Sequence, residues 1–144
     1  MHINKLKKIV SIFIYSQNQL LLALRDNKKE IVYPGCWGLI SGSLNIDENP
    51  YSGIKREVKE EISISNIKKL KFIETYISKK ENIIYYVFKT YLKNTRNIKL
   101  KEGIEYSFFS KSEFLQGYKF SKKLNKICFI VDNPFMKKYY FKTL

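Results

Sequence analysis

The chain has 144 residues, which is enough for one domain, residues 1–144, with a buried core, and its formal net charge is +14 at pH 7. One histidine, His2, and two distant cysteines, Cys36 and Cys128, exclude a Ser-His-Asp triad, a histidine-based zinc site and a cysteine motif. Unpaired cysteines are typical of a reducing compartment, so we expect a cytoplasmic protein whose chemistry depends on carboxylates, lysines and tyrosines.

The first part of the chain predicts a hairpin of two strands. Residues 9–15 form an almost continuous apolar run, typical of a strand that is covered on both faces, and residues 20–25 are predicted to be the next strand. The apolar run is short and Arg25 and Asp26 soon follow, so we interpret it as a strand and not as a signal peptide. Residues 26–33 are predicted to be a charged loop. No segment is long enough to span a membrane.

A short helix is predicted to follow a turn at Pro34 and Gly35 and a link toward residue 42. Asn49 is a suitable N-cap, and Pro50 is a suitable first helical residue. Ser63 stands near the expected end of this helix, where a left-handed residue is usually glycine. A serine in that conformation costs about 1–2 kcal/mol of stability.

Three further strands are expected after the helix. Aromatic and β-branched residues indicate strands over residues 70–77, 82–92 and 104–110. A short helical turn is expected over residues 111–115.

The end of the chain predicts a closing helix and a tail. Helical spacing of apolar residues indicates a helix over residues 121–131, which Asn133 and Pro134 would end. We expect the basic, aromatic tail, residues 135–144, to pack on the domain; covering an edge strand, a dimer interface or a ligand contact are its other candidate roles. This order of elements suits an α/β fold, an α/β/α sandwich with a central mixed sheet.

Three carboxylates gather on one side of the predicted helix. At about 100° per residue, Glu57, Glu60 and Glu61 fall within an arc of roughly 100°, beside an apolar stripe that faces the core. Like charges at this spacing repel each other, and more strongly when they are partly buried. Carboxylate oxygens suit Mg²⁺ or Mn²⁺, whereas the alternative is an ordinary glutamate-rich surface.

The residues upstream favour the metal site. Together the positions follow the pattern Gly-x5-Glu-x7-Arg-Glu-aliphatic-x-Glu-Glu-x-x-aliphatic, which begins at Gly42 and ends at Ile64. The pattern resembles the Nudix box, the signature of the Nudix hydrolases. Eight of its nine anchor positions match, and the departure is Ser63, where the family has glycine.

The resemblance implies a role for each matching residue of the helix. Glu57, Glu60 and Glu61 would bind the metal, and Glu57 is also a candidate base for the attacking water. Arg56 would hold Glu57 in place, and Glu48 would lie at the metal site.

Positions outside the helix complete the implied site. Gly42 would let the backbone pass close to the metal. Arg25 matches a position that contacts phosphate, with a surface arginine as the alternative. In the loop of residues 101–106, Glu102 is the first candidate and Glu105 the second for a further metal ligand or base. A surface turn is the alternative for either glutamate.

The resemblance also implies an activity, that of a Mg²⁺- or Mn²⁺-dependent pyrophosphohydrolase cleaving a nucleoside diphosphate linked to another group. We favour a nucleoside triphosphate or a nucleotide sugar, while ADP-ribose, dinucleoside polyphosphates and capped RNA stay open. The alternative is a non-catalytic Nudix-fold module that binds a nucleotide or RNA. Trp37, Tyr33, Phe120 or a tail aromatic could stack on a base or belong to the core.

The positive charge does not by itself indicate a nucleic-acid partner. The 27 basic residues comprise 24 lysines and 3 arginines, and the lysines are spread along the chain. A positive field gathers anionic substrates of any kind. We therefore expect a small-molecule nucleotide substrate, disfavour nucleic acid, expect no membrane association and leave a homodimer open.

Overall fold

The computed structural model describes residues 5–28, 30, 31 and 33–143, and side chains as far as residue 140. His2 therefore lies outside the described residues. Strand β1 (Lys7–Ser16) is central to a mixed sheet, and its residues from position 10 onward are buried. It pairs in parallel with β6 (Ile83–Tyr91) and antiparallel with β4 (Ile40–Ser43) and β2 (Gln19–Leu24).

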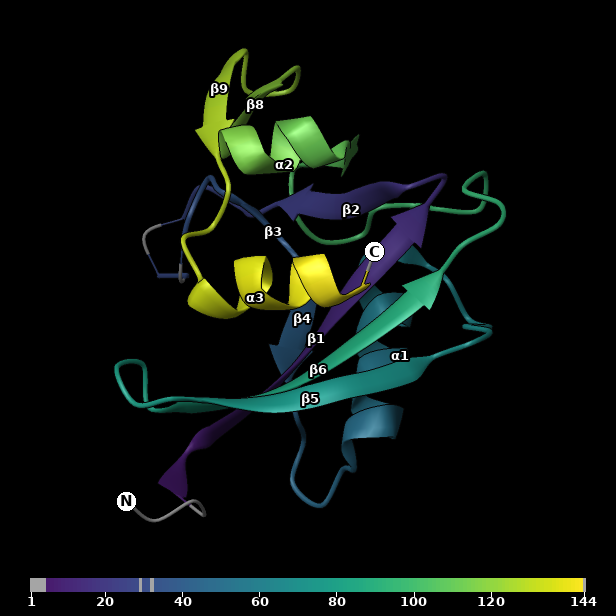
Figure 1. Ribbon diagram of the computed structural model, residues 1–144, viewed down its shortest axis with the longest axis vertical. Helices are drawn as coiled ribbons and strands as arrows, with labels where there is room; N and C mark the ends of the chain where they lie inside the picture. The colour runs from purple at the N-terminus through teal and green to yellow at the C-terminus, as the bar shows by residue number, and fades with distance from the viewer. Residues whose placement is uncertain (1–4, 29, 32, 144) are drawn as a thin grey trace.

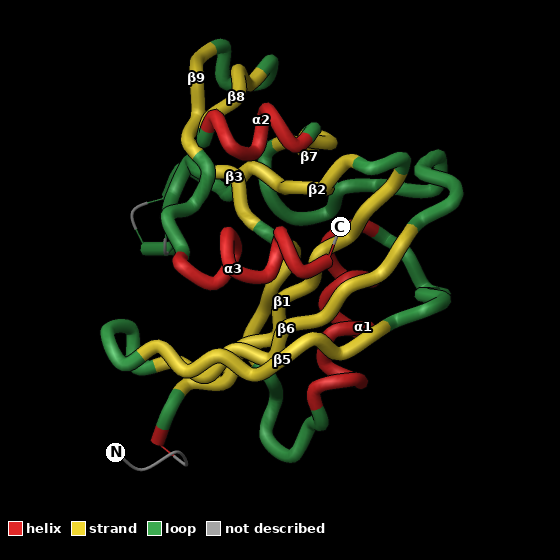
Figure 2. Tube along the Cα trace, in the orientation of Figure 1, coloured by secondary structure: helices red, strands yellow, loops and turns green. Residues whose placement is uncertain are grey.

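The other strands extend this sheet on both sides. Strand β5 (Lys71–Ser78) pairs antiparallel with β6. Strands β3 (Trp37–Gly38) and β7 (Glu105–Phe109) both pair with β2. Figure 2 shows these strands as one twisted layer. The strands expected from the sequence up to residue 110 are confirmed, with ends shifted by one or two residues.

Helices cover both faces of the sheet. Helix α1 (Pro50–Ile62) packs one face, where its apolar residues join the even-numbered residues of β1 in one core cluster. The other face is covered by α3 (Pro134–Thr143) and α2 (Lys111–Gln116), whose aromatic residues belong to a second cluster. Figure 1 shows α3 in front of the strands and α1 behind them. The expected α/β fold with a central mixed sheet is confirmed.

The ends of α1 follow the sequence prediction. The Asn49 side chain accepts a hydrogen bond from the Ser52 amide at 2.9 Å, which caps the helix at its start. Ser63 is left-handed, with φ 65° and ψ 24°, and its amide donates to the Lys59 carbonyl at 3.1 Å. The Ser63 hydroxyl also donates to the Lys99 carbonyl at 2.9 Å, so the serine recovers part of its conformational cost.

The expected closing helix over residues 121–131 is wrong. The chain instead forms a hairpin of β8 (Tyr118–Ser121) and β9 (Lys126–Phe129). Ser121 accepts a hydrogen bond from the Leu124 amide at 3.0 Å, and Asn125 has φ 54°, so a tight turn replaces the first helical turn.

The last helix begins where the predicted one was to end. The Asn133 side chain accepts a hydrogen bond from the Phe135 amide at 3.1 Å and starts α3. Tail residues Phe135, Met136, Tyr139 and Tyr140 are buried in the core. The expectation that the tail packs on the domain is confirmed for these residues.

Candidate functional site

Arg56 is the centre of a group of ion pairs beside the acidic helix face, which is formed by Glu57, Glu60 and Glu61 of α1. Its Nε and Nη2 each donate to one carboxylate oxygen of Glu48 at 2.8 Å. Its Nη1 donates to Glu57 at 2.8 Å and to Glu60 at 3.2 Å. Nη2 also donates to the Ser43 carbonyl at 3.0 Å. Arg56 therefore ties three glutamates and the end of β4 together.

Glu48 is engaged through both of its oxygens. Besides the two bonds from Arg56, its Oε1 accepts the Asn45 amide at 3.0 Å. The Arg56 guanidinium, followed by the Asn45 amide, lowers the pKa of Glu48 to about 2. The structure thus places Glu48 beside the acidic helix face, as a clamp on Arg56.

Gly42 in β4 lies directly against the side chain of Glu57. A Cβ atom built on Gly42 would overlap the Glu57 carboxylate. Glu57 is buried, and its burial raises the pKa of its carboxyl group; Arg56 opposes this shift, while Glu60 and Glu102 add to it. The backbone at Gly42 was expected to pass close to the metal site, and in the structure it passes close to the carboxylate of Glu57.

Glu61 lies about one helical turn after Glu57 on α1. Burial, followed by the carboxylates of Glu57 and Glu102, raises the pKa of Glu61 to about 9, and Arg25 opposes this shift. Glu61 and Glu102 line a pocket of about 150 Å³ together with Arg25 and Gly103. The fold thus brings Glu102, which is distant in sequence, to the helix acids.

The donor set suits a hard divalent cation. Glu57, Glu61 and Glu102 act on one another electrostatically and offer only oxygen atoms. Glu60 is half-exposed and bonds to Arg56. In the part of the chain that the structure describes, no three acidic, histidine or cysteine side chains are already arranged to hold a metal. A bound cation would offset the repulsion that, after burial, raises the pKa of Glu61.

The two late-loop candidates have different surroundings. Glu102 faces the helix acids, whereas Glu105 is directed to the hairpin. The Glu105 Oε1 accepts the Ser121 hydroxyl at 2.8 Å and the Lys123 amide at 3.0 Å. Its position is thus that of an anchor for the β8–β9 turn.

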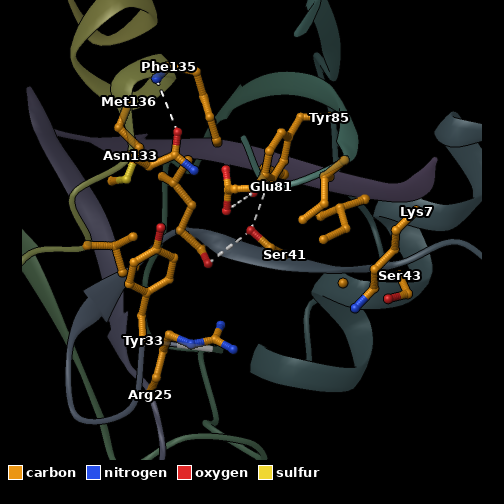
Figure 3. A pocket seen from close by; sticks show the side chains of 17 residues that line it. Lys7, Arg25, Tyr33, Ser41, Ser43, Glu81, Tyr85, Asn133, Phe135 and Met136 are labelled. Atoms are coloured by element: carbon orange, nitrogen blue, oxygen red, sulfur yellow. Dashed lines mark hydrogen bonds between the residues drawn. The ribbon is translucent and has the colours of Figure 1, made fainter. Parts of the chain in front are cut away.

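A second pocket, of about 190 Å³, lies between the sheet and the start of α3 (Figure 3). Arg25 and Leu39 line both this pocket and the acidic one, and Gly42 lines the larger pocket. Figure 3 shows Arg25 and Tyr33 on one side of it and Asn133 and Met136 on another. The remaining lining residues with polar or aromatic side chains include Glu81, Tyr85 and Phe135.

The four candidates for stacking on a base lie in different surroundings. Tyr33 and the tail residue Phe135 line the larger pocket. Trp37 is fully buried, and its Nε1 donates to the Lys119 carbonyl at 3.1 Å, so it is a core residue. Phe120 is exposed on β8. The sequence had not indicated Tyr85 or Asn133, because neither belongs to a local motif.

Comparison with known proteins begins with the family profiles. The profile of the NUDIX domain matches residues 5–126. No curated protein sequence matches the chain. Among solved structures, the chain is 25% identical to a NUDIX hydrolase from Nitrosomonas europaea, with a TM-score of 0.65 over 96% of this chain and 72% of that one.

Two other structures share the fold at lower identity. A MutT/nudix family protein from Enterococcus faecalis is 16% identical, with a TM-score of 0.64 over 73% of this chain; the match spans 44% of that longer protein. The NUDIX domain of Shewanella oneidensis NrtR, solved in complex with ADP ribose, is 11% identical, with a TM-score of 0.71 over 95% of this chain and 87% of that one. Of the helices that the structure describes, none is long and apolar enough to cross a membrane.

Proposed function

The chain belongs to the Nudix family of hydrolases, which act on phosphoanhydride bonds, and on this premise we propose that it is a Mg²⁺- or Mn²⁺-dependent pyrophosphohydrolase. Its substrate would be a nucleoside diphosphate linked to another group. The observation that carries this proposal is the junction of the two pockets. Arg25 and Leu39 line both, so one ligand could reach from the aromatic pocket to the carboxylates of Glu61 and Glu102.

The carboxylates would hold the metal. Glu57, Glu61 and Glu102, with Glu60 beside them, supply the oxygen ligands that Mg²⁺ and Mn²⁺ take. The bound cation would neutralise the pyrophosphate and lower the pKa of a water molecule. The chain's own contribution is to place these acids: Arg56 fixes Glu57 by a 2.8 Å hydrogen bond.

Two other side chains act on the substrate in this proposal. Arg25 would contact the phosphates, since it is a cation in both pockets. Glu57 would accept the proton of the attacking water, because burial brings its pKa closer to the working pH of a general base. Glu102 is the second candidate for that base, since it lies in the acidic pocket.

The larger pocket supports a nucleoside as one half of the substrate. Its aromatic residues Tyr33, Tyr85 and Phe135 offer apolar surface, and Asn133 and Glu81 offer hydrogen-bonding groups. We favour a nucleoside triphosphate or a nucleotide sugar. The ADP ribose complex of the Shewanella oneidensis domain supports a ligand of this chemical class.

A substrate panel tests the proposal directly. Nucleoside triphosphates, nucleotide sugars, ADP-ribose, dinucleoside polyphosphates and capped RNA would be assayed for phosphate release with Mg²⁺, with Mn²⁺ and with EDTA. We expect release from at least one compound that EDTA abolishes. Tight binding of a nucleotide without product in either metal would instead show a non-catalytic module.

Variants of the acids test the site itself. Glu60→Gln and Glu61→Gln should each lower turnover by orders of magnitude while the circular dichroism spectrum is retained; Glu30→Gln, an exposed loop variant, is the control. Full activity of Glu60→Gln on a confirmed substrate would refute the assignment of Glu60 as a ligand.

The late loop can be tested in the same way. Glu102→Gln should lower kcat strongly. Glu105→Ala, which removes the acceptor, should lower the melting temperature through the loss of its two hairpin bonds and leave kcat within a few-fold. The reverse pattern would exchange the roles of the two glutamates.

A further inference from the structure

The β8–β9 hairpin projects away from the main sheet (Figure 1), and one of its faces exposes apolar side chains. Its cross-strand partners on that face are Tyr118 with Phe129 and Phe120 with Ile127. These side chains belong to residues that are 37%, 64%, 52% and 54% exposed, respectively. A contiguous apolar patch on a protein surface often marks an interaction site, whereas singly exposed apolar residues are ordinary.

The opposite face of the hairpin is anchored firmly. Lys119 donates to the Phe108 carbonyl at 3.0 Å and forms an ion pair with Glu113 at 3.0 Å. Cys128, its cross-strand partner, is buried in the core. Ser121 is held by Glu105 at 2.8 Å. The apolar face is thus presented by a fixed two-stranded platform.

The hairpin carries positive charge beside its aromatic residues. Lys122, Lys123 and Lys126 lie at its turn and are exposed. Residues 118–129 contain no acidic residue. Within the described part of the chain, none of the three lysines forms an ion pair. Lys126 pairs with Ser121 on the opposite face, so an anionic partner on the apolar face would meet the exposed aromatic rings and, at the turn, Lys122 and Lys123.

A second copy of the chain fits this surface poorly. Large apolar side chains have areas of about 150–250 Å² each, so the exposed part of the four is roughly 400 Å². A stable interface takes about 800 Å² from each partner. Two copies would also bring together chains that each carry a formal net charge of +14.

We propose that the β8–β9 hairpin binds single-stranded nucleic acid. Tyr118, Phe120 and Phe129 would stack on unpaired bases, and the lysines at the turn would contact phosphates. Every base has a face for stacking, so such a platform tolerates many sequences. The dispersed lysines of the sequence had argued against this partner; the folded hairpin sets Lys122 and Lys123 at a turn next to exposed aromatic residues. The proposal goes beyond hydrolysis and does not depend on it.

The test is fluorescence anisotropy with the full chain and labelled 20-nucleotide oligo-U and oligo-dT, with a duplex of equal length as comparison. We expect both single strands to bind more tightly than the duplex, with affinity that falls as salt rises. Phe120→Ala and Phe129→Ala should each weaken binding about fivefold or more, which is the scale of one lost stacking contact.

Matched controls distinguish binding at this hairpin from nonspecific attraction by the net positive charge of the chain. Lys122→Gln with Lys123→Gln should weaken binding, whereas Lys79→Gln with Lys80→Gln, an exposed pair in another turn, should not. Phe72→Ala, a partly exposed aromatic on β5, should also bind normally. Thermal melts would verify that each variant is folded.

Three outcomes would overturn the proposal. Wild-type affinity in both phenylalanine variants would exclude stacking on this face. Equal losses from the two lysine pairs would show binding by overall charge alone. A concentration-dependent mass in light scattering that Phe120→Ala abolishes would assign the face to self-association. If oligo-U binds and oligo-dT does not, RNA is the partner.

Discussion

Gly42 and Glu57 share a space that has room for only one side chain. A Cβ atom on Gly42 would overlap the Glu57 carboxylate, although the backbone of Gly42 does not have a positive φ. Position 42 therefore requires glycine because a larger side chain would collide with Glu57, and not because the backbone has a left-handed φ. Its place in the Nudix box follows from packing between β4 and α1.

Gly42→Ala should displace Glu57 and lower both stability and turnover. Overpacking costs about 1–3 kcal/mol. A small displacement of a catalytic group lowers the rate about a hundredfold. Urea unfolding and kcat measure the two effects. In a Glu57→Ala background the stability cost of Gly42→Ala should largely disappear; an unchanged cost would show that something other than Glu57 resists the methyl group.

Arg56→Lys keeps the charge but loses the forked hydrogen bonds to Glu48 and Glu57. Lysine cannot hold both oxygens of Glu48 and reach Glu57 at the same time. We expect about 1–3 kcal/mol less stability, because hydrogen bonds to charged groups are lost. Turnover should fall while substrate KM changes little. Equal losses in Arg56→Lys and Arg56→Ala would support this reading, and a fully active Arg56→Lys would contradict it.

The raised pKa of Glu61 predicts how stability depends on pH without metal. The folded state holds this proton up to about pH 9, whereas an ordinary glutamate releases it near 4.5. The folded state then binds more protons than the unfolded state between these values, so stability falls as the pH rises through this range. In EDTA, the melting temperature of the wild type should fall more between pH 5 and pH 9 than that of Glu61→Gln.

Glu61→Gln should therefore be the more stable protein at pH 8 in EDTA, by about 2 °C or more, while it loses activity. Added Mg²⁺ should raise the melting temperature of the wild type and have a smaller effect on the variant. A melting-temperature difference that is the same at every pH would contradict the shifted pKa.

Ser63→Gly should stabilise the protein without changing its chemistry. The left-handed φ of 65° costs a serine about 1–2 kcal/mol, and the exposed hydrogen bond to Lys99 returns only part of this. We expect an increase of a few degrees in melting temperature and unchanged kcat. Ser63→Ala, which keeps the strained φ and loses the hydrogen bond, should melt below the wild type. A glycine variant that melts no higher would show that the hydrogen bond outweighs the strain.

The sequence by itself determined α1 and the arrangement of its acidic residues. Asn49, Pro50 and Ser63 define its ends through interactions over a few residues, and the helical repeat alone places Glu57, Glu60 and Glu61 on one face. Alternation and apolar runs likewise predicted most strands, because both signals are local.

Tertiary structure decided the rest. The segment predicted as a helix over residues 121–131 is a hairpin, and its turn is held both by the local hydrogen bond between Ser121 and Leu124 and by Glu105, a contact across 16 positions that no local pattern records. Tertiary structure likewise sets the different surroundings of Glu102 and Glu105. The pocket that joins Arg25, Tyr85 and Asn133 also depends on segments that only the folded sheet and α3 bring together. Helix periodicity can be recognised from residues that are close in sequence, whereas the residues that line a pocket are distant in sequence and meet only in the folded chain.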